Sequence, residues 1–138
     1  MKKILVIEGD DAISRQFEAT TKGIDLEFFS SARLIPVHEI FKIKPDIILL
    51  EYRPPFGFGG DLCKELKTDP RTMGMKVILT STDHHIAKIA CDNLADGYLR
   101  KPFDKSQLVA TLINLLQEPK QTVAKTSPKR SFWTVLGV

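Results

Sequence analysis

Short apolar runs alternate along the chain with segments whose apolar residues recur at helical spacing. An apolar run that is rich in branched side chains and closed by a polar turn indicates a strand buried on both faces. The strand candidates are 3–7, 26–29, 46–51, 76–80 and 98–100. Apolar positions three and four residues apart predict amphipathic helices between and after these strands. The helix candidates are 12–19, 32–41, 61–67, 84–94 and 104–118. Lys22-Gly23 is a stop signal for the first of them, and Pro36 restricts where the second can begin.

The order of these elements predicts an α/β protein. Connections that contain a helix are too long for hairpins, so successive strands pair in parallel through right-handed crossovers. We therefore expect a doubly wound, five-stranded parallel sheet with five helices covering both of its faces. In such sheets the functional crevice lies beyond the carboxyl ends of the strands. The polar residues at or just past those ends are Glu8, Asp10, Glu51, Thr80 and Lys101.

Composition places the chain among ordinary globular proteins. Its 138 residues, with 43% hydrophobic and 27% charged, are enough for one domain with a substantial core and argue against extensive disorder. Cys63 and Cys91 lack CxxC or metal-ligand spacing, so we expect two thiols in a reducing compartment. No signal-peptide core or membrane-length apolar stretch is evident, which predicts a cytoplasmic protein.

Four motifs in a fixed order carry a family resemblance. Glu8-Gly9-Asp10-Asp11 follows the first strand, Glu51 ends the third, Thr80 ends the fourth, and Lys101-Pro102 follows the fifth. Pro55 and Gly59 lie in the loop after Glu51. Together these motifs resemble the receiver domain of two-component response regulators, whose fold is the flavodoxin-like arrangement expected above. The resemblance covers residues 1–118 and leaves 119–138 as a tail.

The resemblance implies a phosphoacceptor site that is degenerate in this chain. In the family, two acids after the first strand and an acceptor aspartate hold Mg²⁺, and the aspartate attacks phosphorus. Here Gly9 replaces the second acid and Glu51 replaces the acceptor. The added methylene moves the attacking oxygen by about an ångström, and misplacement on that scale can cost about a hundredfold in rate.

We therefore expect an atypical receiver, or pseudo-receiver, with little or no phosphorylation, no enzymatic activity and no cofactor. Glu8, Asp10 and Glu51 are only weak Mg²⁺ ligand candidates, because the metal demands near-octahedral geometry. Asp10 is either a replacement ligand or a helix cap. The alternative is a working Mg²⁺-dependent phosphoacceptor that uses Glu51.

The family's switch residues are matched by Thr80 and Tyr98. In the family the hydroxyl follows the phosphoryl group and the aromatic ring moves between exposed and buried positions. Glu51 either imitates a phosphorylated aspartate, by pairing with Lys101 and drawing Thr80 inward, or merely neutralises Lys101. The resemblance also implies that Lys101 precedes a cis Pro102, and that Pro55 and Gly59 shape the loop after the acceptor position.

The function expected from this resemblance is phosphorelay signal transduction through protein–protein interaction. The partners would be a histidine kinase, a phosphotransfer protein or an output protein, bound at the fourth helix, fifth strand and fifth helix, about residues 85–116. A homodimer is left open, and no membrane partner is expected. The aromatic pair in Phe56-Gly57-Phe58 either anchors a partner or packs inward. His38, His84 and His85 lack ligand spacing and are expected to be exposed.

The predicted tail has two parts. Residues 119–131 form a basic, polar linker with Lys120, Lys125, Lys129 and Arg130 and no acid, so the overall +3 leaves the first 118 residues at about −1. Residues 132–138 are apolar and either dock on the body, bind a partner or begin a further domain. Four positive charges without interleaved aromatics make nucleic acid an unlikely partner.

Overall fold

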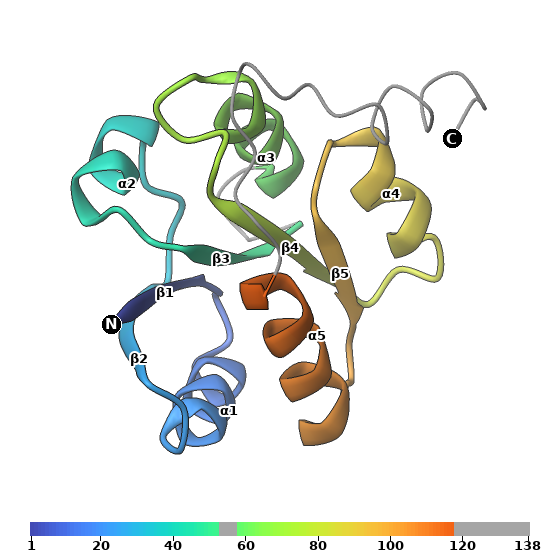
Figure 1. The fold of residues 1–138 in the computed structure, drawn as a ribbon. Helices are drawn as coiled ribbons and strands as arrows, with labels where there is room; N and C mark the ends of the chain where they lie inside the picture. The colour runs from blue at the N-terminus through green and yellow to red at the C-terminus, as the bar shows by residue number, and fades with distance from the viewer. Residues whose placement is uncertain (53–57, 118–138) are drawn as a thin grey trace.

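The computed structural model describes residues 1–52 and 58–117 (Figure 1). Strands and helices alternate strictly through these residues. The strands are β1 (Lys2–Ile7), β2 (Leu26–Ser31), β3 (Ile47–Glu51), β4 (Lys76–Ser81) and β5 (Gly97–Arg100). The helices are α1 (Asp11–Thr21), α2 (Val37–Ile43), α3 (Gly59–Thr68), α4 (Ile86–Asp92) and α5 (Lys105–Gln117).

The five strands form one parallel sheet in the order β2-β1-β3-β4-β5. The chain winds outward in one direction to β2 and then in the other through β3 to β5, so the order reverses at β1 and β3. This arrangement confirms the expected doubly wound α/β fold with five strands and five helices. A reversal point of this kind opens a crevice at the carboxyl ends of the central strands.

Two apolar clusters cover the two faces of the sheet. Alternate residues of the central strands point to opposite faces, so Leu5 and Leu50 join one cluster while Val6 and Leu49 join the other. In Figure 1, α2, α3 and α4 cover one face and α1 and α5 cover the other. Because β1, β3 and β4 are buried on both faces, their sequences are almost continuously apolar.

The expected helices at 32–41 and 84–94 were wrong at their ends. Helix α2 begins at Val37, since Pro36 is an extended N-cap and disfavours helical geometry in the residue before it. Helix α4 begins at Ile86, after a turn in which Asp83 accepts a hydrogen bond from the His85 N–H. It ends before Leu94, which has the left-handed φ of 66°.

A buried ion pair ties α3 to the far edge of the sheet. Lys67 Nζ lies 2.8 Å from Asp96 Oδ2, and both side chains are almost completely buried. The same ammonium donates to the carbonyls of Met73 and Met75, while Asp96 accepts from the Val77 N–H. Each charge is therefore met by several hydrogen-bond partners, which is what allows it to be buried.

The remaining general expectations concern the cysteines and membrane segments. Cys63 is a buried free thiol on α3, and Cys91 is a half-buried free thiol on α4, as expected. Among the described helices, none has the length and apolar character that crossing a bilayer requires. The tail 119–138 and Pro55 lie outside the described residues.

Candidate functional site

The carboxyl ends of four strands bring the predicted site residues together. Glu8 follows β1, Glu51 is the last residue of β3, and Lys101 follows β5. Thr80 lies in β4 directly opposite Glu51 in the strand register. Residues separated by up to 93 positions in the chain thus share one crevice, because parallel strands present their carboxyl ends at the same edge.

Lys101 lies between the two glutamates of this crevice. Its Nζ is 2.7 Å from Glu8 Oε1 and 3.0 Å from Glu51 Oε2. The Glu8 side chain is fully buried, and those of Lys101 and Glu51 are largely so. One ammonium therefore neutralises part of the charge of two carboxylates in a region where water screens them little.

Backbone N–H groups hold the other oxygens of both carboxylates. Glu51 Oε1 accepts from the Gly9 N–H at 3.0 Å, and Glu8 Oε2 accepts from the Asp10 N–H at 3.2 Å. The sequence predicted Gly9 only as the loss of a carboxylate, and this donor role was not predicted. The sequence signal for this donor is its position, because any non-proline residue in the turn after β1 presents its N–H at this edge of the sheet.

Asp10 acts as the N-cap of α1. Its Oδ1 accepts a hydrogen bond from the Ala12 N–H at 2.9 Å, and its backbone is extended, as at most N-caps. Of the two roles considered for this residue, the geometry shows the cap. The cap stabilises the first turn of α1, so moving this carboxylate into the crevice would sacrifice that interaction.

The pKa values of the two glutamates are shifted in opposite directions. Burial raises the pKa of Glu8 above its ordinary value, and hydrogen bonds from Lys101 and the Asp10 N–H only partly oppose this. Burial also acts to raise the pKa of Glu51, but the Gly9 N–H, Glu8 and Lys101 together outweigh it and leave that pKa lowered. Glu51 is consequently the more firmly ionised member of the pair.

Thr80 and Tyr98, the two residues expected to act as a switch, take separate positions. Thr80 is completely buried, and its Oγ1 has no hydrogen-bond partner among the described residues. Tyr98 is 48% exposed on β5. Glu51 is thus bound to Lys101 and Gly9 rather than to the Thr80 hydroxyl, while the tyrosine ring faces outward.

The loops around the crevice are fixed by local packing. The Lys101 N–H donates a hydrogen bond to the Ser81 carbonyl, and the Lys101-Pro102 peptide is cis, as expected. Phe103 packs on Phe17, with ring centroids 5.3 Å apart. Gly59, the expected loop-shaping glycine, begins α3 so close to β3 that a Cβ there would overlap the Glu51 carbonyl oxygen. Only glycine permits this approach.

The crevice does not fit a Mg²⁺ site. Mg²⁺ needs hard oxygen ligands in near-octahedral geometry. Glu8 and Glu51 both contact the Lys101 ammonium, Gly9 has no carboxylate, and the Asp10 carboxylate caps α1. In residues 1–52 and 58–117, no group of three or more His, Cys, Asp or Glu side chains is arranged to hold a metal ion.

The other sequence candidates lie outside the crevice. His84 Nε2 lies 3.4 Å from Arg100 Nη2, and His85 Nδ1 lies 3.3 Å from Asp83 Oδ1, both on the surface. His38 is exposed on α2. Phe58 is 56% exposed, so it does not pack inward, whereas Phe56 and Gly57 fall outside the described residues.

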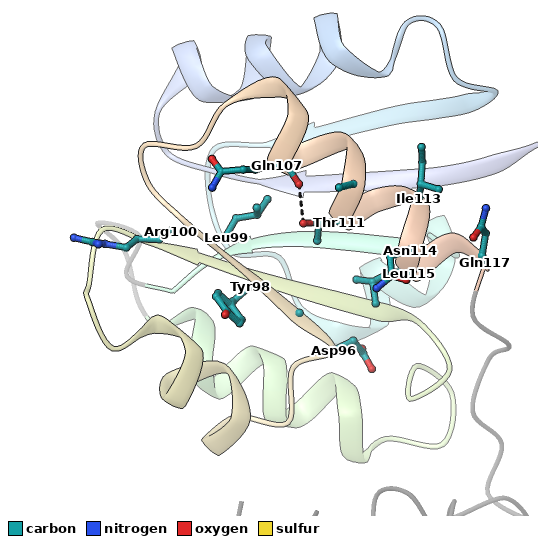
Figure 2. Close-up of a pocket in the computed structure, with 12 residues that line it drawn as sticks. Asp96, Tyr98, Leu99, Arg100, Gln107, Thr111, Ile113, Asn114, Leu115 and Gln117 are labelled. Atoms are coloured by element: carbon teal, nitrogen blue, oxygen red, sulfur yellow. Dashed lines mark hydrogen bonds between the residues drawn. The ribbon is translucent and has the colours of Figure 1, made fainter.

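A surface groove is lined by residues of β5 and α5. Its volume is about 830 Å³, and it is lined by β5 residues that include Tyr98 and Arg100 and by α5 residues that include Gln107, Thr111 and Ile113 (Figure 2). Tyr98 and Ile113 are among the large hydrophobic side chains that the described residues leave exposed. The groove lies within the surface expected to bind partners.

Sequence comparison finds transcriptional regulators and response regulators that match most of this chain. It is 31% identical over 120 residues to the DNA-binding dual master transcriptional regulator RpaA of Synechocystis sp., a match that covers 85% of this chain and 50% of RpaA. It is 29% identical over 119 residues to the phosphate regulon transcriptional regulatory protein PhoB of Pseudomonas aeruginosa, covering 84% and 52%. The chain therefore spans about half the length of these curated relatives. No protein-family model matches it.

Structural comparison agrees with the observed topology. The crystal structure of a putative response regulator from Chloroflexus aurantiacus superimposes with a TM-score of 0.75 at 23% identity, covering 85% of this chain and 98% of that one. Fold, crevice and sequence matches together define the class of this protein. It is a response-regulator receiver domain of two-component signalling.

Proposed function

We propose that this receiver domain relays signals through protein contacts, with little or no phosphoryl transfer to Glu51. The observation that carries the proposal is the position of Lys101 Nζ, within 3.0 Å of carboxylate oxygens from both Glu8 and Glu51. The family's chemistry requires a divalent cation to neutralise the incoming phosphoryl group. The Lys101 ammonium carries a single charge and cannot coordinate six oxygen ligands, so it does not replace the cation in this chemistry.

The geometry of Glu51 supports the same conclusion. Both carboxylate oxygens are engaged, one by the Gly9 N–H and the other by Lys101. A nucleophilic oxygen must be free to approach phosphorus in line, at near-contact distance. Attack by Glu51 would require breaking at least one of these two interactions without a metal to compensate.

We further infer that Glu51 fixes an inactive-like arrangement and does not imitate a phosphorylated aspartate. A mimic would engage the Thr80 hydroxyl, but Thr80 Oγ1 is buried without a partner among the described residues. The exposed Tyr98 is consistent with an unswitched domain. A carboxylate also has one charge fewer and one oxygen fewer than a phosphoryl group, which limits mimicry.

The partner surface in this proposal is formed by α4, β5 and α5. Tyr98 and Ile113 expose apolar area beside the groove, and Arg100 and Gln107 add donors and an acceptor at its rim. A surface that combines aromatic and aliphatic anchors with polar edges suits protein recognition. The partners would be a histidine kinase, a phosphotransfer protein or an output protein, and a second copy of the domain is the remaining candidate.

The proposal is tested by phosphorylation in vitro. The protein is incubated with Mg²⁺ and a small acyl phosphate donor, and its intact mass is measured before and after. We expect no phosphoryl adduct on the natural chain and an adduct on the Gly9→Asp/Glu51→Asp variant, which restores both missing features. A stable adduct that maps to Glu51 in the natural chain would establish the alternative, a working Mg²⁺-dependent acceptor.

A further inference from the structure

A second groove lies between the β2–α2 connection and the first turns of α3. Its volume is about 360 Å³. Leu34 and Ile35 on one side and Leu62 on the other give it an apolar lining, and these residues also pack against the core beneath α2 and α3. The groove is distinct from the β5–α5 surface, since the two share no lining residue.

Phe58 gives this groove an aromatic edge. It is the N-cap residue of α3 and is 56% exposed, although its ring borders an apolar surface. Pro36, also exposed, stands on the opposite side. Aromatic side chains that become buried against apolar pockets often anchor protein and peptide partners.

The groove also has a negative rim. Asp61 and Glu65 are exposed one turn apart on α3, so their carboxylates lie on the same side of the helix. They are the charged members of the described lining. A matching segment would therefore combine basic side chains with adjacent aromatic and aliphatic ones.

The chain itself contains such a segment. Lys129-Arg130 is followed, after Ser131, by Phe132-Trp133 and then by Leu136. We propose that residues 129–136 dock in the groove between the β2–α2 connection and α3. Phe132 and Trp133 contact Phe58 and the apolar lining, while Lys129 and Arg130 pair with Asp61 and Glu65.

The connecting segment is long enough for this contact. Between Gln117 and Lys129 lie 11 residues, 118–128. Fully extended they span about 36–40 Å, comparable with the roughly 35 Å diameter implied by a radius of gyration of about 13 Å for a domain of this size. A tethered segment also competes at an effective concentration in the millimolar range, so modest intrinsic affinity is sufficient for docking.

Trp133 provides a direct measurement, because it is the single tryptophan of the chain. We expect its fluorescence in the natural protein to be shifted to the blue and protected from acrylamide relative to a peptide of residues 125–138. Asp61→Lys/Glu65→Lys should raise the quenching constant at least twofold, and Phe58→Ala should shift the emission to the red. Circular dichroism confirms that each variant is folded.

Two matched controls test the charge pairing. Glu18→Lys/Asp25→Lys reverses the same number of exposed acids away from the groove and should leave quenching unchanged. Adding Lys129→Glu/Arg130→Glu to Asp61→Lys/Glu65→Lys restores opposite charges and should restore protection.

Three outcomes would overturn the docking proposal. The first is a Trp133 as accessible in the natural protein as in the peptide. The second is protection that the groove variants do not change, which would place the segment elsewhere. The third is protection that disappears on dilution, which would indicate contact with a second copy. None of these outcomes bears on phosphorylation of Glu51, so the docking proposal and the proposed function fail independently.

Discussion

Lys101 Nζ lies 3.0 Å from Glu51 Oε2, so the residue at the acceptor position is already bound to a cation of its own chain. The same nitrogen is 2.7 Å from Glu8, on the other side of the crevice. This three-residue arrangement connects the ends of β1, β3 and β5. Its energetics lead to predictions about stability as well as about chemistry.

Replacing Glu51 with glutamine should destabilise the fold near pH 7. The substitution removes the charge that Lys101 and the Gly9 N–H stabilise, and hydrogen bonds to a charged group contribute about 1.5–3 kcal/mol each. We expect a loss of about 1–2 kcal/mol in the free energy of unfolding, measured by urea denaturation. An unchanged midpoint would contradict a stabilising role for the Glu51 carboxylate.

The loss caused by Glu51→Gln should depend on pH. Because the folded state lowers the pKa of Glu51, the charged form contributes stability above the ordinary value of 4.5, and this contribution disappears as the pH falls through the lower folded-state pKa. The difference between Glu51→Gln and the natural protein should therefore shrink at acidic pH. A difference that grows below pH 4.5 would have the wrong sign.

Glu8→Gln should behave in the opposite way. Burial raises the pKa of Glu8 in the folded state, so its ionisation destabilises the fold as the pH rises from 4.5 through the higher folded-state value. Near pH 7 the glutamine variant should be the more stable protein, and its advantage should vanish below pH 4.5. Urea denaturation of both proteins between pH 4 and pH 7 would measure this difference in stability. A variant that is less stable at neutral pH would show that the Lys101–Glu8 attraction outweighs desolvation.

Gly59→Ala should be strongly destabilising. A Cβ at this position would overlap the backbone of Glu51, so α3 would have to move away from β3. Overpacking of this kind costs about 1–3 kcal/mol. Gly23→Ala is the matched control, because no described atom lies within 4 Å of a Cβ there, and its effect should stay within about 0.5 kcal/mol. Equal effects in thermal or urea unfolding would contradict the close approach.

Lys67→Met should be among the most damaging single substitutions. It removes the ammonium that lies 2.8 Å from the buried Asp96 carboxylate, together with two hydrogen bonds to backbone carbonyls. Breaking a buried pair by removing one partner costs about 3–5 kcal/mol. Lys88→Ala breaks the exposed pair with Asp92 and should leave the free energy of unfolding almost unchanged. A small loss of stability for Lys67→Met in urea denaturation would show that water hydrates the Asp96 carboxylate in the variant.

The sequence was informative wherever one physical effect dominated. Continuous apolar runs such as 47–50, within the predicted strand 46–51, indicated doubly buried parallel strands, and the order of the strands predicted the crevice that unites Glu8, Glu51 and Lys101. Helix ends were less predictable. Pro36 indicated that the start of the 32–41 helix is restricted, but helical spacing alone did not place that start at Val37.

The details of the site depended on three-dimensional relationships that spacing does not encode. The donation from the Gly9 N–H is made by the backbone and leaves no mark in the side-chain sequence. Lys67 occupies a position in an amphipathic helix where lysine is ordinarily solvated, and only its distance from Asp96 shows why it is buried. Whether Glu51 would reach Thr80 likewise depended on the competing contact with Lys101.

The central claim is that Lys101 takes the place of the divalent cation between Glu8 and Glu51. The most direct test is a Mg²⁺ titration followed through the backbone amide NMR signals of the residue at position 9 and of Lys101. The account predicts no saturable shift in the natural protein and a saturable shift at both amides in Gly9→Asp/Glu51→Asp. Saturable binding by the natural protein, with displacement of the Lys101 ammonium from Glu51, would contradict it.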